Sequence, residues 1–406
     1  MRDVLFLQPA YPPEMQQFVR GLAQSGARVW GVGDSGRQSL PDSLTRHLSG
    51  YLQVPGILRE QDVIQRIERW LGSRRPDLVE GAWEPVIQLA AQLRERWGLP
   101  GMSVDTVLGF RDKRTMHERI SRAGLLTARS HRVQNLPQAW AAAEDLGYPL
   151  VLKPTDGAGG ADTHICSSPQ ELDHALRQTR HVAELVIEAF VSGEEFTFEA
   201  LSVRGSPVFH SVCRYEPNVL DARKNEWISP IICCLRDLHE PRLQDGIRLG
   251  HRALQALGMG SGMSHMEWFR QPDDRAIFGE VACRPPGSKM LDLMNTAWDT
   301  DLYRAWGMSI LGKPPQLPTR SPYNAAIIFK RAHGQGRIRA IHGVSEFIRA
   351  HRPHIARIDL LPIGARRRDW RATFIADGNI IVRHPDLEVT MALAREAART
   401  IHLVAT

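Results

Sequence analysis

Residues 279–287, Gly-Glu-Val-Ala-Cys-Arg-Pro-Pro-Gly, place an acid and a base at a spacing that a β-strand turns to one face. The apolar residues 276–278 before them are typical of a strand. Side chains two apart along a strand share a face, so we expect Glu280, Ala282 and Arg284 to point the same way. A carboxylate beside a guanidinium is an environment that binds divalent cations and phosphate groups.

A second carboxylate belongs to the same pattern. Glu267 lies 13 residues before Glu280, in the strand-like residues 263–269. The Pro-Asp-Asp sequence at 272–274 predicts a turn, so the two segments should form a hairpin. The hairpin would bring both carboxylates close to Arg284. The pattern alone leaves two interpretations open, a metal and phosphate site or simple ion pairs at the edge of a sheet.

Composition limits the class of protein. The 406 residues can hold two or three domains, and 43% apolar with 24% charged residues is an ordinary globular mixture. The net charge of +6 comes mostly from arginines spread along the chain. It suits nucleotides and nucleic acids equally, but no zinc-finger or RNA-motif pattern accompanies it. We therefore expect no specific nucleic-acid partner.

The cysteines and the apolar runs favour a cytoplasmic protein. None of the five cysteines falls in a C-x-x-C pair, so neither a disulfide framework nor a zinc site is indicated. The first apolar run is too short for a signal peptide, and no run approaches the ~20 apolar residues of a membrane helix. We expect no membrane contact, and a homodimer as the common default assembly.

The N-terminal pattern is that of an open parallel α/β sheet. Residues 4–7 and 29–33 are apolar strands, separated by a helix that ends at Gly26. The alternation of helix and strand continues to Trp97 and stops near Gly101. A full G-x-G-x-x-G is missing, so no dinucleotide site is predicted.

Two lysines and a glycine loop follow. Lys113 begins an amphipathic helix, and Lys153 ends a strand. The strand runs into a loop with glycines at Gly157, Gly159 and Gly160, whose backbone N–H groups could turn toward an anion. The loop lacks the P-loop pattern, so we interpret it as the tip of a β-hairpin. A plain flexible hairpin is the alternative.

Two further acids stand at strand positions. Residues 184–188 form a strand that ends at Glu188, and residues 194–201 alternate as the next strand. Backbone exposed after Glu188 could pair with an adenine edge, and the Glu195 carboxylate could hold ribose hydroxyls. The alternation itself indicates only a half-buried strand.

Beyond a proline-rich boundary at 312–322, the last part has an α+β pattern. Residues 325–329 and 373–375 are predicted strands, and residues 386–401 an Ala-rich helix. Asp-Gly-Asn at 377–379 predicts a hairpin turn that joins residues 373–375 to the strand after it.

This ordered set resembles the ATP-grasp superfamily, most of all its carboxylate–amine ligase branch, with L-amino-acid ligases and biotin-carboxylase-like enzymes. The resemblance covers nearly the whole chain and implies a mixed α/β and α+β fold. It implies an N-terminal open parallel α/β domain at 1–108 and a two-part ATP-grasp domain at 109–318. The lid subdomain would span about 128–187, and a small C-terminal α+β domain would span 319–406.

The resemblance also implies a site for ATP and Mg²⁺. The residues that would bind ATP are Lys113 and Lys153 at the phosphates, Gly157, Gly159 and Gly160 in the lid loop, Glu188, Phe190 and Val191 at the adenine, and Glu195 at the ribose. Glu267 and Glu280 would hold Mg²⁺, and Arg284 would stabilise charge on the transferred phosphoryl group. Many members carry Asn where this chain has Ala282, which leaves open how many magnesium ions bind.

The implied reaction joins a small carboxylate to an amine. The carboxylate attacks the γ-phosphorus of ATP to give an acyl phosphate and ADP, and the amine then displaces phosphate to give an amide. Candidate substrate contacts are His265, Arg214, Lys224 and Lys289. The alternatives are a buried structural histidine and solvated surface charges.

Two other functions stay open. One is an ATP-dependent carboxylase that uses bicarbonate, and the other is a nucleotide-binding regulator that does not turn over. ADP release stimulated by an acid together with an amine would distinguish a ligase from both.

Overall fold

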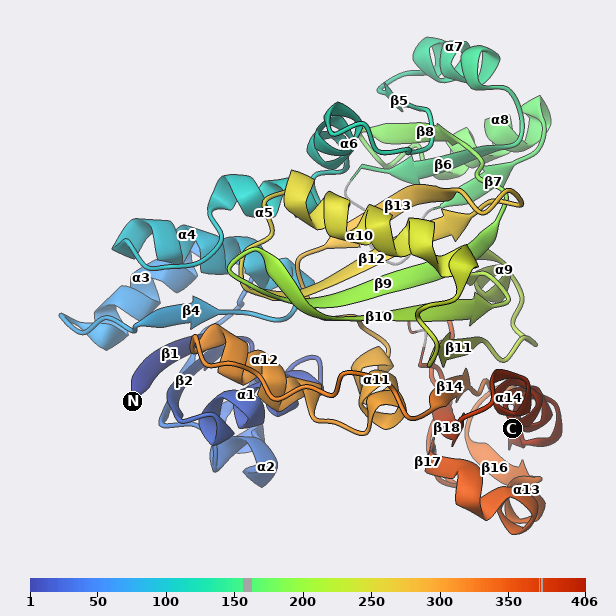
Figure 1. Cartoon of the computed structure of the whole chain (residues 1–406). Helices are drawn as coiled ribbons and strands as arrows, with labels where there is room; N and C mark the ends of the chain where they lie inside the picture. The colour runs from blue at the N-terminus through green and yellow to red at the C-terminus, as the bar shows by residue number, and fades with distance from the viewer. Residues whose placement is uncertain (156–162, 372, 374) are drawn as a thin grey trace.

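The computed structural model describes residues 1–155, 163–371, 373 and 375–406. In these residues the strands form four sheets, one parallel and three largely antiparallel, with helices packed against them (Figure 1). The loop glycines Gly157, Gly159 and Gly160 lie outside the described residues. Within the described ranges, every helix is too short or too polar to cross a membrane.

The N-terminal sheet is parallel, with strand order β3-β2-β1-β4, as the sequence predicted. Its strands are β1 (Arg2–Leu7), β2 (Ala27–Gly33), β3 (Gly50–Gln53) and β4 (Leu78–Glu80). Its helices are α1 (Met15–Gln24), α2 (Asp42–Thr45), α3 (Glu60–Leu71), α4 (Ile87–Trp97) and α5 (Val104–Arg111). Alternate residues of β1 enter two different cores, Val4 and Phe6 on one face and Leu5 and Leu7 on the other. Both faces of the sheet are therefore covered, which is why the strand is apolar throughout.

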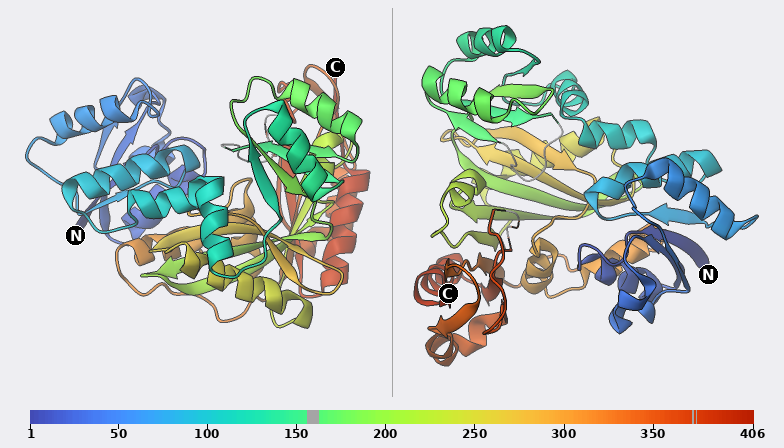
Figure 2. Two further views of the ribbon diagram at one scale, coloured as in Figure 1. Left: turned by 90° about the horizontal axis from the view of Figure 1, so that it is seen from above. Right: turned by 180° about the vertical axis from the view of Figure 1, so that it is seen from behind.

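A second sheet has the order β5-β8-β6-β7 and lies where the lid is predicted, so we call residues 130–189 the lid. Its elements are β5 (Ser130–Val133), α7 (Leu136–Leu146), β6 (Leu150–Pro154), β7 (His164–Cys166), α8 (Pro169–Gln178) and β8 (Leu185–Ala189). β6 pairs antiparallel with β7, which confirms the predicted hairpin around the glycine loop. Figure 2 shows the lid at one end of the molecule and the N-terminal sheet at the other.

The largest sheet has eight strands in the order β13-β12-β9-β10-β11-β14-β18-β17. Its strands are β9 (Glu194–Val203), β10 (Ser206–Glu216), β11 (Ile231–Cys234), β12 (Gly262–Arg270), β13 (Ala276–Ala282), β14 (Asn324–Phe329), β17 (Ile355–Leu360) and β18 (Gly378–His384). The helices around it are α6 (Lys113–Arg122), α9 (Val219–Lys224), α10 (Gln244–Ala256), α11 (Met290–Trp298) and α12 (Leu302–Ile310). The predicted hairpin is β12 with β13, and α10 covers one face of this part of the sheet (Figure 1).

The C-terminal part shares the large sheet, because β14 pairs with β11 on one side and β18 on the other. It adds a three-stranded sheet of β15 (His333–Gly334), β16 (Ile338–His342) and β19 (His402–Ala405), with helices α13 (Val344–His351) and α14 (Leu387–Thr400). Single 3-10 turns are η1 (Arg37–Ser39), η2 (Glu84–Val86), η3 (Pro241–Leu243) and η4 (Arg352–His354).

One predicted hairpin is wrong. Thr373 and Ile375 lie outside the strands, and β18 pairs with β14 and β17 instead of with either of them. Phe374 lies outside the described residues. Asp377 is completely buried, and its carboxylate accepts hydrogen bonds from the backbone N–H groups of Ala332 and Arg368, each at 2.8 Å. The aspartate therefore joins two loops rather than forming an exposed turn.

Helices α1 and α12 connect the N-terminal sheet to the rest of the molecule. They meet at Gly21 and Gly307, where the backbones approach closely. A Cβ added at Gly21 would lie 2.2 Å from the carbonyl oxygen of Tyr303, and one added at Gly307 would lie 2.7 Å from the backbone of Gly21. Only glycine at both positions permits this helix contact.

We expect Gly21→Ala to lower the free energy of unfolding by about 1–3 kcal/mol, because the added methyl group overpacks a backbone contact. Alanine in a helix is otherwise favoured over glycine by about 1 kcal/mol, so a loss would come from the contact. Gly36→Ala is the control, since a Cβ there would meet nothing closer than 3.6 Å. Urea unfolding of the three proteins measures the effect, and equal midpoints for Gly21→Ala and wild type would contradict it.

Candidate active site

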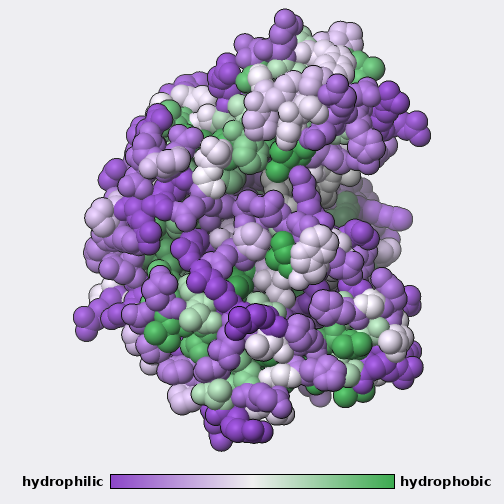
Figure 3. Space-filling view, turned by 90° about the vertical axis from the view of Figure 1, so that its right-hand side faces the viewer, coloured by the Kyte–Doolittle hydropathy of each residue, from purple (hydrophilic) through white to green (hydrophobic). Residues whose placement is uncertain are grey.

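A cavity of about 710 Å³ lies between the lid and the β12–β13 end of the large sheet. The surface is hollowed beneath the upper lobe, which is the lid, on the face shown in Figure 3. The predicted site residues that line the cavity are Lys113, Lys153, Glu188, Phe190, Val191, Glu195, His265, Glu267, Glu280 and Arg284. The structure thus brings together residues that come from six separate elements and from the loops after β8 and β13.

The other predicted substrate contacts lie outside this lining. Arg214 lies 3.6 Å from the Glu216 carboxylate, and the Lys289 ammonium lies 3.4 Å from the Glu14 carboxylate. Lys224 is exposed at the end of α9. The structure does not bring these three residues to the cavity wall.

The hairpin of β12 and β13 sets the two central carboxylates. Glu267 and Glu280 are direct partners across the two strands. Trp268 then faces Phe278, so Gly279 is an extra residue, a β-bulge. A Cβ at Gly279 would lie 2.8 Å from the Glu267 carbonyl oxygen, so the bulge requires glycine. It places two acids side by side on the cavity face.

Lys113 neutralises one of these acids. Its ammonium donates to Glu280 Oε2 at 2.8 Å from the first turn of α6, whose N-cap Asp112 accepts a hydrogen bond from the backbone N–H of Thr115. Burial disfavours the charged ammonium, but the carboxylates around it, Glu280 first, outweigh burial and raise the pKa of Lys113. The lysine therefore stays charged.

Lys153 makes the matching contact from the lid. Its ammonium lies 2.7 Å from Glu188 Oε2 on the neighbouring strand β8. Glu188 is buried, and its other oxygen, Oε1, has no hydrogen-bond partner among the described residues. His117 Nε2 lies 3.8 Å away from this Oε1, and burial lowers the pKa of the His117 ring. One carboxylate oxygen is thus left to accept a hydrogen bond from a ligand.

His265 holds the second central acid in its ionised state. Its ring lies between two carboxylates, with Nδ1 at 2.6 Å from Glu199 and Nε2 at 3.5 Å from Glu267. Burial disfavours the charged ring, yet the two carboxylates raise the pKa of His265 to about 10. Burial alone would raise the pKa of Glu267, but the charged His265 brings it below its ordinary value.

Arg284 is held by a residue of the N-terminal part. Its Nε donates to the Glu84 carboxylate at 2.6 Å, across 200 residues of sequence. Burial lowers the pKa of Arg284, but the Glu84 carboxylate outweighs it and raises this pKa. Glu84 belongs to η2, so the N-terminal part completes the wall of the cavity.

Glu195 ties the helix α9 to the site. Its Oε2 accepts a hydrogen bond of 2.8 Å from the backbone N–H of Val219, at the start of α9. Burial, together with the nearby charge of Glu267, raises the pKa of Glu195 to about 8.

Sequence reasoning missed four functional candidates, Glu84, His117, Glu199 and Arg223. His117 lies four residues after Lys113 on one helix, and Glu199 four after Glu195 on one strand, so their spacing could have indicated a shared face. Glu84 lies in a three-residue 3-10 turn and Arg223 in a six-residue helix. Both elements are too short for the spacing of apolar residues to show which face is buried.

The carboxylates fit a magnesium ion better than a structural metal. No group of three or more His, Cys, Asp or Glu side chains that could hold a metal occurs in the described part of the chain. Two carboxylates, Glu267 and Glu280, stand together at one end of a cavity. Magnesium commonly binds through one or two carboxylates plus waters and phosphates, so this set of donors suits it. Ala282 lines the cavity as well and supplies a methyl group, which cannot bind a metal.

The position of His265 generates a prediction about stability and pH. Its pKa is higher in the folded chain than the ordinary 6.5, so its stabilisation is fully present below about pH 6.5 and is lost as the pH rises toward 10. Without nucleotide and divalent cation, we expect the wild type to exceed His265→Gln in free energy of unfolding most at pH 6, and progressively less toward pH 10. Urea unfolding across this range measures the difference, and a constant difference would contradict the prediction.

Residues 112–197 match the family described as "Carbamoyl-phosphate synthase L chain, ATP binding domain". The L-arginine-specific L-amino acid ligase of Bacillus subtilis is 24% identical over 236 residues, a match that covers 56% of this chain and 56% of that protein. The alignment thus spans only about half the length of this curated relative.

Solved structures share the fold over the whole chain. The L-amino acid ligase from Bacillus licheniformis superposes with a TM-score of 0.79 at 19% identity, covering 100% of this chain and 99% of that one. The biotin carboxylase domain of the Hydrogenobacter thermophilus 2-oxoglutarate carboxylase, crystallised with MgADP, ADP and bicarbonate, has a TM-score of 0.71 at 16% identity and covers 99% of this chain and 90% of that one. The matching family segment and the common architecture show that the chain has the ATP-grasp fold.

Proposed function

We propose that the protein is an ATP-dependent ligase that joins a small carboxylate to an amine and releases ADP and phosphate. One observation carries the proposal. Two lysines, two acids and an arginine line one cavity between the lid and the large sheet, and they are Lys113, Lys153, Glu267, Glu280 and Arg284. A triphosphate needs this combination of cations and metal-binding acids.

The nucleotide would lie between the lid and the large sheet. Lys113 and Lys153 would bind the phosphates, which are polyanions able to replace Glu280 and Glu188 as partners of these ammonium groups. Glu267 and Glu280 would hold magnesium, which supplies positive charge at the phosphates. The free oxygen of Glu188 suits an amino group such as that of adenine.

The chemistry follows from the weakness of a carboxylate as an electrophile. Its oxygen attacks the γ-phosphorus of ATP, ADP leaves, and an acyl phosphate results. The amine nitrogen then attacks the acyl carbon, phosphate departs with the C–O bond electrons, and the nitrogen loses a proton. Arg284 would stabilise negative charge on the phosphoryl group, and the lid would exclude water from the reactive acyl phosphate.

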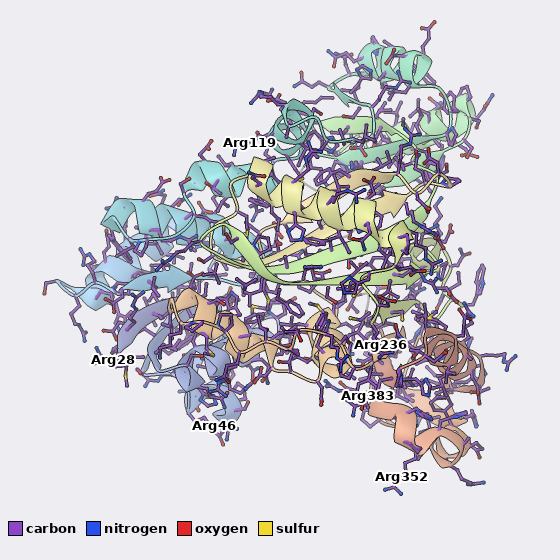
Figure 4. All side chains as sticks on the ribbon, in the orientation of Figure 1. Arg28, Arg46, Arg119, Arg236, Arg352 and Arg383 are labelled. Carbon is purple, nitrogen blue, oxygen red and sulfur yellow. The ribbon has the colours of Figure 1, made fainter. Side chains whose placement is uncertain are left out.

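The distribution of positive charge supports a small acidic ligand rather than nucleic acid. The arginines labelled in Figure 4 come from the N-terminal sheet, the middle of the chain and the C-terminal part, and they are Arg28, Arg46, Arg119, Arg236, Arg352 and Arg383. These six arginines thus come from widely separated parts of the chain.

A carboxylase that uses bicarbonate is the second candidate, because the fold is also that of a biotin carboxylase domain. Both candidates phosphorylate an acid, and they differ in whether an amine is needed. We expect ADP release to rise when an amino acid or small carboxylate is added together with an amine. Turnover with bicarbonate and without an amine would favour the carboxylase, and nucleotide binding without turnover under either condition would favour a regulator.

We expect Glu280→Gln to lower ADP release by roughly 100-fold or more, because a metal ion contributes several kcal/mol of charge stabilisation and each 1.36 kcal/mol is tenfold in rate. The amide can still accept a hydrogen bond from Lys113, so the melting temperature should stay close to that of the wild type. Glu144→Gln, at an exposed position of α7, is the matched control. Near-normal turnover of Glu280→Gln would count against the metal assignment.

A further inference from the structure

One arginine of the cavity, Arg223, has no ion-pair or hydrogen-bond partner in the described part of the chain. Five lysines and arginines line the cavity in the described part of the chain, and they are Arg111, Lys113, Lys153, Arg223 and Arg284. Lys113, Lys153 and Arg284 each contact a carboxylate at 2.6–2.8 Å. Arg111 donates to the backbone carbonyl of Glu84. Among the described residues Arg223 makes neither an ion pair nor a hydrogen bond, and its Nε is buried without a partner.

Arg223 is half-buried and lies near a buried cation, Arg331. The positive charges of Arg223 and Arg331 repel each other, and Arg331 is only 5% exposed. The Nε of Arg331 is likewise buried without a hydrogen bond. Burial lowers the pKa of Arg223, and the carboxylate of Glu267 only partly opposes this effect. Cations that are buried or half-buried normally contact an anion or an acceptor, so the Arg223 guanidinium is suited to bind an anionic group.

The helix that carries Arg223 is fixed at both ends. At its start, the backbone N–H of Val219 is bound by the Glu195 carboxylate at 2.8 Å. At its end, Arg331 donates to the carbonyl oxygens of Ala222 at 2.8 Å and Asn225 at 2.7 Å. The guanidinium of Arg331 in turn lies 4.6 Å from the ring centroid of Trp370. The C-terminal part therefore holds the backbone of α9 in place before any ligand binds, and such preorganisation favours binding.

The surroundings of Arg223 differ from those of the two lysines. Lys113 and Lys153 lie on α6 and the lid strand β6, whereas Arg223 lies on α9 beside β10 and β11. Ile232 of β11 and Met290 of α11 are apolar residues that line the same cavity. A cavity that holds a guanidinium and apolar side chains suits a small organic acid, because the planar fork of the guanidinium pairs with a carboxylate through two hydrogen bonds.

We propose that Arg223 anchors the carboxylate of an organic substrate, whose apolar part meets Ile232 and Met290, while the nucleotide phosphates bind elsewhere in the cavity. This inference rests on the proposed ligase function and names a binding residue for its non-nucleotide substrate. Arg331 is the positioning residue, since it holds α9 without lining the cavity.

The test is a binding experiment that needs no turnover. The full chain is saturated with magnesium and a non-hydrolysable ATP analogue, so that the phosphate contacts are filled. The standard L-amino acids and short mono- and dicarboxylates are then titrated, and the melting temperature is followed. We expect at least one of these acids to stabilise the wild type, and Arg223→Gln to bind that acid roughly 10- to 100-fold more weakly, as the loss of a charge-assisted pair predicts. Arg223→Lys should recover part of the affinity.

Two comparisons keep the result specific. Arg122→Gln, at an exposed end of α6, should behave as the wild type. Arg223→Gln should bind ADP and the triphosphate analogue with an affinity within about twofold of the wild type, because the nucleotide phosphates are proposed to bind elsewhere in the cavity. If Arg223→Gln instead weakens the triphosphate analogue and spares ADP, Arg223 contacts the γ-phosphate and the proposal is wrong.

Three other results would also overturn it. They are a response lost in Lys224→Gln but kept in Arg223→Gln, equal acid affinity in Arg223→Gln and wild type, and a wild type that responds to none of the acids. Failure of the ligase function is seen separately. In that case ADP release fails with every acid and amine pair, while carboxylate binding at Arg223 persists.

Discussion

The structure around the cavity depends on the pairing of two carboxylates across β12 and β13. The bulge at Gly279 brings Glu267 and Glu280 opposite each other on one face, where two like charges repel each other. The arrangement is therefore stable only with cations on both sides. Lys113 at 2.8 Å from Glu280 and the charged ring of His265 beside Glu267 provide them.

This requirement for compensating charge explains why the site lies where separate parts of the chain meet. Lys113 comes from the helix that precedes the lid, and the partner of Arg284, Glu84, comes from the N-terminal part. The partner of His265, Glu199, lies on β9 in the large sheet. Each of these ion pairs therefore joins two different elements of the fold. A change in how these elements pack would alter the charge balance at the pair.

The sequence predicts the parts of this arrangement that have a local cause. The start of α6 at Lys113 follows from the Asp112 cap, and the β12–β13 hairpin follows from its turn residues. Contacts such as Arg284 with Glu84 could not be predicted, because a pair 200 residues apart leaves no periodic pattern. The turn predicted at 377–379 failed for a related reason, since tertiary contacts bury Asp377 and use its carboxylate to bind two loops. The roles of the individual cavity residues stay predictions.

The cations that line the cavity differ in whether they already have a carboxylate partner. Lys113 and Lys153 already have carboxylate partners, so a triphosphate would bind there by exchange of partners. Arg223 has none among the described residues, so an acid bound to it would pair with a half-buried charge that has no partner there. The first process loses contacts as it makes new ones, whereas the second only makes them. Glu195 accepts a hydrogen bond from the start of α9, and the charge of Glu267 raises the pKa of Glu195. Nucleotide and magnesium bound at Glu267 would therefore alter the charge interactions of Glu195, and through it those of the helix that carries Arg223. Acid and nucleotide would therefore be coupled through α9, in the sense that each alters the affinity for the other by the same factor.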